Sequence, residues 1–293
     1  RNGDRGRGLR DRAGDLVSEE DKTQQCVDEV LSAARALPSA GWGQRLGGDG
    51  PVGATETFLA LVRQQVYARD ANPDGLYDME TDARPPVDGL LDAAAHLDSA
   101  LKRLEGPLLE LRKSLLARLD DEAEDLEPAA RARILGLVRS LTRRGLQPVA
   151  AWRAMLNSLS SDTPELFVDW FGVSRIGGRD VDVGFFRHWL DPTQPLAKTV
   201  FEPAHGVLIT SATLRDQSGD EVNQDWANAD ARVGAGHIGT EFHWAAHPSP
   251  FDYAGETRIY VVGDVNRNSA DEVSAAYREL FLAAGGGGLG LFT

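Results

Sequence analysis

Two hydroxyl side chains follow directly on a short apolar run, at Ser211 and Thr213. Residues 206–210 (Gly-Val-Leu-Ile-Thr) have the length and composition of a buried strand, which predicts that both hydroxyls stand where that strand leaves its sheet. Ligands of open α/β sheets bind outside the carboxyl ends of the strands. We therefore expect these hydroxyls to be well placed for function. The plainer interpretation is a strand that ends in a polar turn.

A second group of chemically useful residues lies in the stretch 128–161, which carries six arginines and no acidic residue. Arg139 and Arg143 are spaced one helical turn apart, and this spacing points both away from the apolar side of the same predicted helix. Together with Arg144 they form a candidate stripe for the phosphates of a single DNA strand. The alternative is an ordinary solvated face that pairs with the acidic stretch 120–127.

Metal ligands are the third possibility, because His237, Glu241, His243 and His247 crowd into a short span. Their spacing fits neither a His-Glu-x-x-His site nor a usual structural zinc site, and no cysteine is near. The single cysteine, Cys26, excludes an internal disulfide and any four-cysteine zinc or iron–sulfur site built from this chain alone. We expect no metal and no iron–sulfur cluster in the chain.

Composition limits the partners. The 293 residues carry 31 Lys and Arg against 45 Asp and Glu, a formal net charge of −14, which argues against a histone-like, non-specific DNA binder. DNA held in a local basic groove remains compatible with that charge. No apolar run approaches the roughly 20 residues that span a bilayer, and no signal-like segment opens the chain. We expect a cytoplasmic protein without a membrane partner.

The first half of the chain must position the arginines, and its periodicity is helical. Helices are expected over 19–37 and 54–69, with a loop between them over 41–53. Apolar residues from Leu90 to Leu115 then alternate steps of four and three, the pattern of a heptad seam, with a kink or break expected at Gly106-Pro107. A return helix from Pro128 and a further helix carrying Val149 and Leu156 complete a predicted bundle with a long antiparallel hairpin.

After Pro164 the pattern changes from helical to strand-like. Segments 165–175 and 179–190 are aromatic and β-branched, and Gly177-Gly178 between them predicts a two-residue hairpin turn. Strands are expected over 206–210, 258–262 and 289–292, with an amphipathic helix over 271–284 before the last. The predicted class is α+β overall, in which a helical bundle precedes the beginning of a parallel α/β domain.

Four strings in this order resemble the DinG-type, XPD-like branch of superfamily 2 ATP-dependent DNA helicases: 191–192 (Asp-Pro), 203–214 (Pro-Ala-His-Gly-Val-Leu-Ile-Thr-Ser-Ala-Thr-Leu), 249–253 (Ser-Pro-Phe-Asp-Tyr) and 289–293 (Leu-Gly-Leu-Phe-Thr). The resemblance covers the chain from about Glu165 onward, and the helical half matches the family's arch insertion only by position and helicity. It implies a helical, arch-like domain at 1–164, followed by partial RecA-like α/β elements of the P-loop NTPase type. These are the end of the first motor lobe at 165–248 and the start of the second at 249–293.

The resemblance also assigns roles. It implies that Ser211, Ala212, Thr213 and Leu214 form a motif that couples nucleotide state to the motor lobes, and that Thr293 approaches the DNA backbone. It implies a motor that moves 5′ to 3′ on single-stranded or forked DNA, in repair or replication. A monomer is the favoured oligomeric state.

The departures from the family concern the ATP site. The chain contains no phosphate loop and no Gly-Lys pair, and the nearest string to the acidic box, 121–124 (Asp-Glu-Ala-Glu), ends in Glu. ATP and Mg²⁺ are therefore expected to bind mainly to residues outside this chain, which we interpret as a central fragment of a longer helicase. We expect no catalytic residue within it and no activity from it alone. The alternative is a non-catalytic helical interaction or adaptor module with a degenerate α/β tail.

Overall fold

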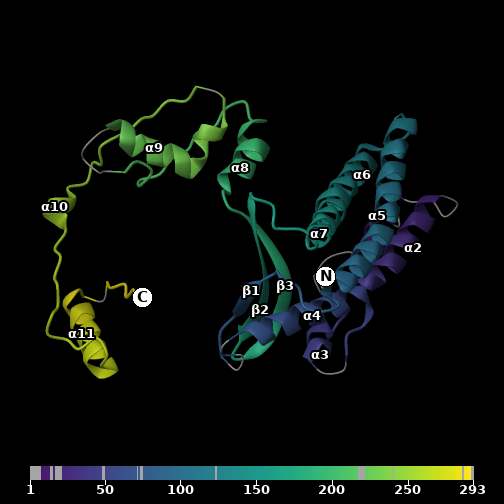
Figure 1. Cartoon of the computed structure of the whole chain (residues 1–293). Helices are drawn as coiled ribbons and strands as arrows, with labels where there is room; N and C mark the ends of the chain where they lie inside the picture. The colour runs from purple at the N-terminus through teal and green to yellow at the C-terminus, as the bar shows by residue number, and fades with distance from the viewer. Residues whose placement is uncertain are drawn as a thin grey trace. The chain divides into compact units, whose positions relative to one another are not determined.

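The computed structural model describes residues 8–13, 16, 22–47, 50–70, 72, 75–122, 124–216, 222–239, 241–285 and 287–291. The chain divides into two compact units, Arg1–His205 and Gly206–Thr293. It is a mixed α+β structure, mostly helical, with one three-stranded antiparallel sheet among the described residues (Figure 1). No P-loop or RecA fold is identified in this described part, so the α+β class is confirmed only at that coarser level. The division into domains 1–164, 165–248 and 249–293 stays a prediction.

The first unit begins with the helices α1 (Leu9–Ala13), α2 (Lys22–Ala33), α3 (Trp42–Gly47) and α4 (Gly53–Arg69). The two predicted helices of this region are confirmed as α2 and α4, whereas the predicted loop over 41–53 is wrong because it contains α3. Arg45 of α3 donates from Nε to Glu56 Oε2 at 2.7 Å, and Glu56 lies in the first turn of α4. A tertiary ion pair thus holds this short helix, and periodicity alone cannot indicate such a pair.

The heptad seam forms α5 (Leu90–Asp121), whose leucines at 97, 101, 104, 108, 111 and 115 are buried. Of the kink or break predicted at Gly106-Pro107, the break does not occur, because the helix continues through both residues. Proline costs a helix one backbone donor, and the buried leucines on either side keep this helix packed despite that loss. α6 (Pro128–Leu141), a π-helical segment (Thr142–Leu146) and α7 (Gln147–Ser158) return along α5, which confirms the predicted hairpin.

The sheet has the order β1-β2-β3, with β1 at Met79–Asp82, β2 at Phe167–Ile176 and β3 at Arg179–Trp189. The predicted β2–β3 hairpin is confirmed. Gly177 and Gly178 have φ of 59° and 77°, the positive values that a tight two-residue turn needs and that glycine adopts without strain. The sequence does not predict β1, since its four residues, Met-Glu-Thr-Asp, show little strand character.

Buried charges join the sheet to the helices. The Asp169 carboxylate on β2 is fully buried and accepts hydrogen bonds from Arg187 of β3 at 2.6 Å and from Arg84 at 2.9 Å. Burial on its own raises the pKa of Asp169, but the hydrogen bonds from Arg187 and Arg84 outweigh it and place the pKa below the usual value. Asp180 of β3 has a similar arrangement with Arg63 of α4.

The second unit contains α9 (Val222–Val233), α10 (Tyr253–Glu256) and α11 (Ala270–Ala283). The predicted helix over 271–284 is confirmed as α11. Ser269 caps its N-terminus, because the Ser269 Oγ accepts a hydrogen bond from the Glu272 backbone N–H. The strands predicted over 206–210 and 258–262 do not form, and the described residues 289–291 of the strand predicted over 289–292 are not in a strand either. Leu208 is 88% exposed and Val261 is 93% exposed. A strand needs neighbours for its backbone donors and acceptors, and the described residues of this unit supply none. Phe292 lies outside the described residues.

No helix in the described part of the chain combines the length and apolar character needed to cross a membrane.

Candidate functional site

The segment Ser211–Leu214 forms a turn rather than the end of a strand. The backbone N–H of Thr213 donates to Ser211 Oγ at 3.2 Å, and the two hydroxyl oxygens are 3.4 Å apart. Both side chains are exposed. Serine commonly stabilises turns through this kind of local hydrogen bond, so the structure gives the segment the conformation of a polar turn.

The turn is fixed to α9 by side chains that the sequence patterns do not single out. Arg232 Nη2 donates to the Leu214 carbonyl oxygen at 2.9 Å and to Asp216 Oδ1 at 2.7 Å, while Asn228 Nδ2 donates to Asp216 Oδ2 at 2.8 Å. The hydrogen bonds from Arg232 and Asn228 lower the pKa of Asp216. Asn228 and Arg232 are four residues apart on the helix, which is the one sequence signal that could have grouped them.

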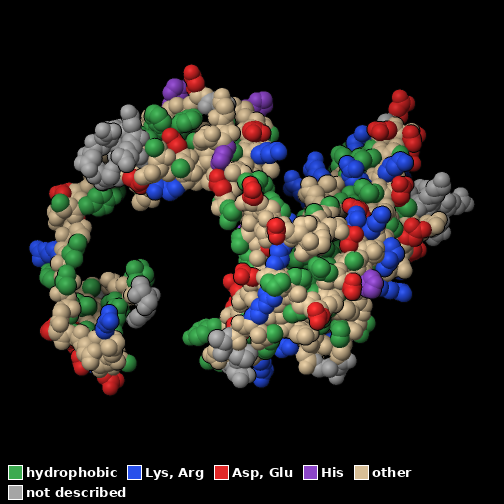
Figure 2. Space-filling model, in the orientation of Figure 1, with side chains coloured by type: hydrophobic (Ala, Val, Ile, Leu, Met, Phe, Trp, Pro, Cys, Tyr) green, Lys and Arg blue, Asp and Glu red, His purple; other side chains and the backbone are tan. Residues whose placement is uncertain are grey.

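The arginine stripe lies on α6 and the π-helical segment, in the first unit. Arg139, Arg143 and Arg144 are all exposed, and none of them forms an ion pair with a described acidic residue. In Figure 2, Lys and Arg side chains gather over the surface that α6 occupies in Figure 1. The structure therefore brings the three predicted arginines to the surface with their donors available.

Arg153, from the same acid-free stretch, has a different position. Its guanidinium donates from Nε to Asp98 Oδ1 at 2.8 Å and also pairs with Glu105, both on α5. The hydrogen bond from Asp98 is the main reason that the pKa of Arg153 is raised above its usual value. The stretch thus contains Arg153, which ties α7 to α5, and the exposed residues Arg139, Arg143 and Arg144.

The remaining candidates are not assembled into a site. Among the residues that the structure describes, no group of three or more His, Cys, Asp or Glu side chains is placed to hold a metal, and His237, His243 and His247 belong to no such group. Thr293, the remaining candidate for DNA contact, lies outside the described residues. Exposed guanidinium groups that form no ion pair with a described acidic residue are suited to phosphate oxygens, and this is the chemistry that the arrangement offers best.

No family model, curated protein or solved structure matches the chain. The sequence strings and the geometry of the residues described above are therefore the basis for assigning a function.

Proposed function

We propose that the chain is part of an ATP-dependent 5′–3′ DNA helicase of the DinG type, and that its arginine face, defined as Arg139, Arg143 and Arg144, binds single-stranded DNA. The observation that carries the family assignment is the order of the strings ending at Leu214 and Tyr253, followed by the Gly-Leu-Phe run near residue 290. A single Ser-Ala-Thr string would be weak evidence, whereas three strings in sequence order are much more specific.

The arginine face supports the DNA-binding part of the proposal. The three side chains are exposed on one continuous helical stretch, while the acidic side chains Asp98 and Glu105 of the neighbouring helix are already occupied by Arg153. A chain with a net charge of −14 repels DNA overall, so a local cationic face is what a DNA contact would need. Each guanidinium can neutralise one phosphate and release its counterions.

The exposed apolar segments of the second unit support the proposal that the chain belongs to a helicase motor. Ile259 and Val261 are 85% and 93% exposed, and Leu208 is 88% exposed. Leaving such side chains in water costs about 25 cal/mol for each Å² of apolar surface. In a RecA-like lobe these segments would be central strands buried between neighbouring strands. We infer that the neighbouring strands are formed by residues outside the described part of this chain.

The chemistry of the proposed protein is phosphoryl transfer to water, with ATP and Mg²⁺ held mainly by residues beyond this chain. Ser211 and Thr213 would transmit the nucleotide state rather than react. The coding sequence on both sides should therefore encode a phosphate loop and acidic box upstream and an arginine-bearing motor motif downstream.

Purified protein of this sequence should show no Mg²⁺-dependent ATP hydrolysis above background, with or without single-stranded DNA. Robust turnover would contradict the placement of the ATP site outside the chain. Flanking coding sequence without motor motifs would instead favour the adaptor module.

A further inference from the structure

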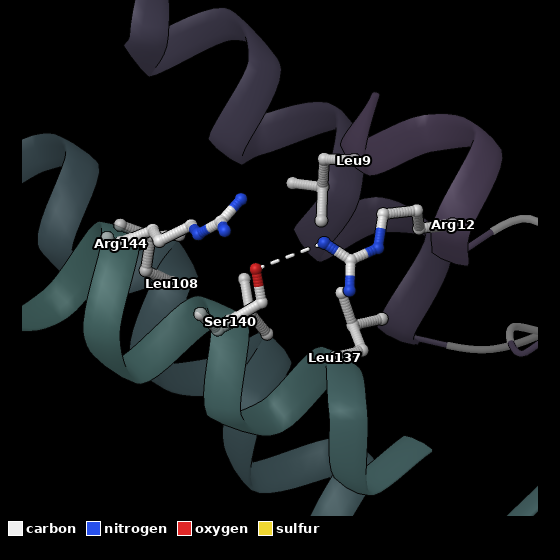
Figure 3. Close-up of a pocket in the computed structure, with 8 residues that line it drawn as sticks. Leu9, Arg12, Leu108, Leu137, Ser140 and Arg144 are labelled. Atoms are coloured by element: carbon white, nitrogen blue, oxygen red, sulfur yellow. Dashed lines mark hydrogen bonds between the residues drawn. The ribbon is translucent and has the colours of Figure 1, made fainter. Parts of the chain in front are cut away.

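A pocket of about 290 Å³ lies between α1 and the α6–π-helical stretch of the first unit. Figure 3 shows two guanidinium groups reaching over it from different elements, Arg12 from α1 and Arg144 from the π-helical segment, with Ser140 of α6 between them. Arg12 Nη1 donates to Ser140 Oγ at 3.1 Å, and this hydrogen bond joins residues that are 128 positions apart. The pocket is thus built by tertiary packing rather than by one helix face.

The polar side chains of this pocket offer more hydrogen-bond donors than acceptors. None of the eight lining residues is acidic, and no described carboxylate forms an ion pair with Arg12 or Arg144. A guanidinium has five N–H donors, of which Arg12 uses one on Ser140. Since the Ser140 oxygen accepts that bond, its own hydroxyl hydrogen remains available for another acceptor. An anion placed here would receive hydrogen bonds from three side chains.

The surroundings strengthen such an interaction. The other lining residues are Gly145 and four leucines, Leu9, Leu108, Leu137 and Leu141. Apolar walls lower the local dielectric constant, so charge–charge attraction is stronger there than on an open surface. Arg144 also belongs to the π-helical segment, a departure from α-helical geometry that occurs frequently at functional sites.

We propose that Arg12, Ser140 and Arg144 form a binding site for a phosphate group. Two guanidiniums and one hydroxyl suit a tetrahedral phosphate, which offers more accepting oxygens than a planar carboxylate does. A nucleic-acid backbone and free phosphate can each supply this group, and the site itself does not depend on the helicase proposal.

The test titrates inorganic phosphate into the protein by calorimetry and thermal denaturation, at constant ionic strength set with sodium chloride. Wild type should bind phosphate and gain thermal stability that chloride does not give. R144Q and R12Q should each weaken phosphate binding by about tenfold or more, since each removes charge-assisted hydrogen bonds. R103Q is the matched control, because it removes the same charge from an exposed position of α5 that does not line this pocket, and it should bind phosphate as wild type does.

Two further measurements keep the outcome clear. S140A keeps both charges and should weaken binding severalfold, which tests the site without the risk that loss of Arg12 loosens α1. Competition with a 20-nucleotide single strand distinguishes the sources: displacement of phosphate assigns the site to nucleic acid, and binding without displacement assigns it to free phosphate. Either result supports the site even if the strand fails to bind and the helicase proposal falls. Phosphate binding that is absent, matched by chloride, or unchanged in R12Q and R144Q would overturn it.

Discussion

Arg153 of α7 donates from Nε to Asp98 Oδ1 of α5 at 2.8 Å, and its Nη1 pairs with Glu105 further along the same helix. These pairs hold the two arms of the helical hairpin together. They also mean that the arginines of one acid-free stretch have two different roles, structural for Arg153 and exposed for Arg139 and Arg143. The two roles predict separable effects of mutation.

Replacing Arg153 with glutamine should reduce stability without reducing DNA binding. The change leaves two partly buried carboxylates without their cation, at a cost of about 1–2 kcal/mol in the free energy of unfolding. R143Q should change that free energy by less than about 0.5 kcal/mol, because the side chain is exposed. Urea unfolding followed by circular dichroism measures both. Equal destabilisation by the two variants would contradict this division of roles.

Asp169 should be among the most sensitive polar positions of the first unit. Its carboxylate is fully buried between Arg84 and Arg187, so Asp169→Asn leaves two arginines without a counter-charge. Removing one partner of a buried ion pair costs about 3–5 kcal/mol. Asp182→Asn, on exposed β3 surface, is the matched control and should be nearly neutral. If urea unfolding gives both variants the wild-type free energy, the buried cluster does not stabilise the fold.

The lowered pKa of Glu56 predicts how the stability of the first unit depends on acid pH. Hydrogen bonds from Arg45 are the main reason that the pKa of Glu56 is lowered from 4.5 to about 2. Because the folded pKa is the lower one, the stabilisation is complete above about pH 4.5 and is lost as the pH falls towards 2. Its full size is about 3 kcal/mol by linkage.

The matching variant is Glu56→Gln, which keeps the volume and removes the charge. Its deficit in unfolding free energy relative to wild type should be largest near neutral pH and should shrink below pH 4.5, towards the folded pKa of about 2. A deficit that does not change with pH over this range would show that the charge of Glu56 contributes nothing.

Gly184 of β3 should not accept a larger side chain without a shift of its neighbours. Gly172 and Gly184 lie opposite each other in the β2–β3 register, and a Cβ at Gly184 would stand 2.7 Å from Phe186 Cζ. The Phe186 ring also stacks on Trp170 at 5.3 Å, so it cannot move without losing that contact. Gly184→Ala should lower the free energy of unfolding by about 1–3 kcal/mol.

Gly136→Ala provides the comparison for that measurement. This glycine lies inside α6, and no neighbouring atom beyond the helix backbone comes within 4 Å of the place that an alanine methyl group would occupy. Alanine should therefore stabilise the helix by about 0.5–1 kcal/mol. The two alanine variants should shift the thermal midpoint in opposite directions. A thermal midpoint for Gly184→Ala at or above that of wild type would rule out the steric explanation at Gly184.

Local patterns predicted the helical half well. The heptad from Leu90 to Leu115 became the buried side of α5, and Gly177-Gly178 became the hairpin turn, because both depend on residues close in sequence. Contacts between distant residues were missed. α3 is held by Glu56, and β1 is held by its register with Val173, so neither has a local signature.

In the second half of the chain, local patterns predicted strands that do not form among the described residues. Apolar composition predicted strands around Leu208 and Val261, but a strand also needs neighbours, and the described residues provide none. The candidate site was predicted in the same uneven way. Spacing placed Arg139 and Arg143 on an exposed face, whereas the pairing of Arg153 with Asp98 and the position of Arg12 beside Ser140 needed the tertiary structure.

The most direct test of the proposed function is the affinity for a labelled 20-nucleotide single strand, measured by fluorescence anisotropy across a range of salt concentrations. R139Q/R143Q/R144Q is compared with K102Q/R103Q/K113Q, which removes the same charge from exposed positions of α5. If the arginine face binds three phosphates, its variant should lose at least about tenfold in affinity, and its log–log salt slope should be shallower by about 2. The α5 variant should stay close to wild type. Equal affinities and equal slopes in wild type and both variants would contradict the proposal that this face binds DNA.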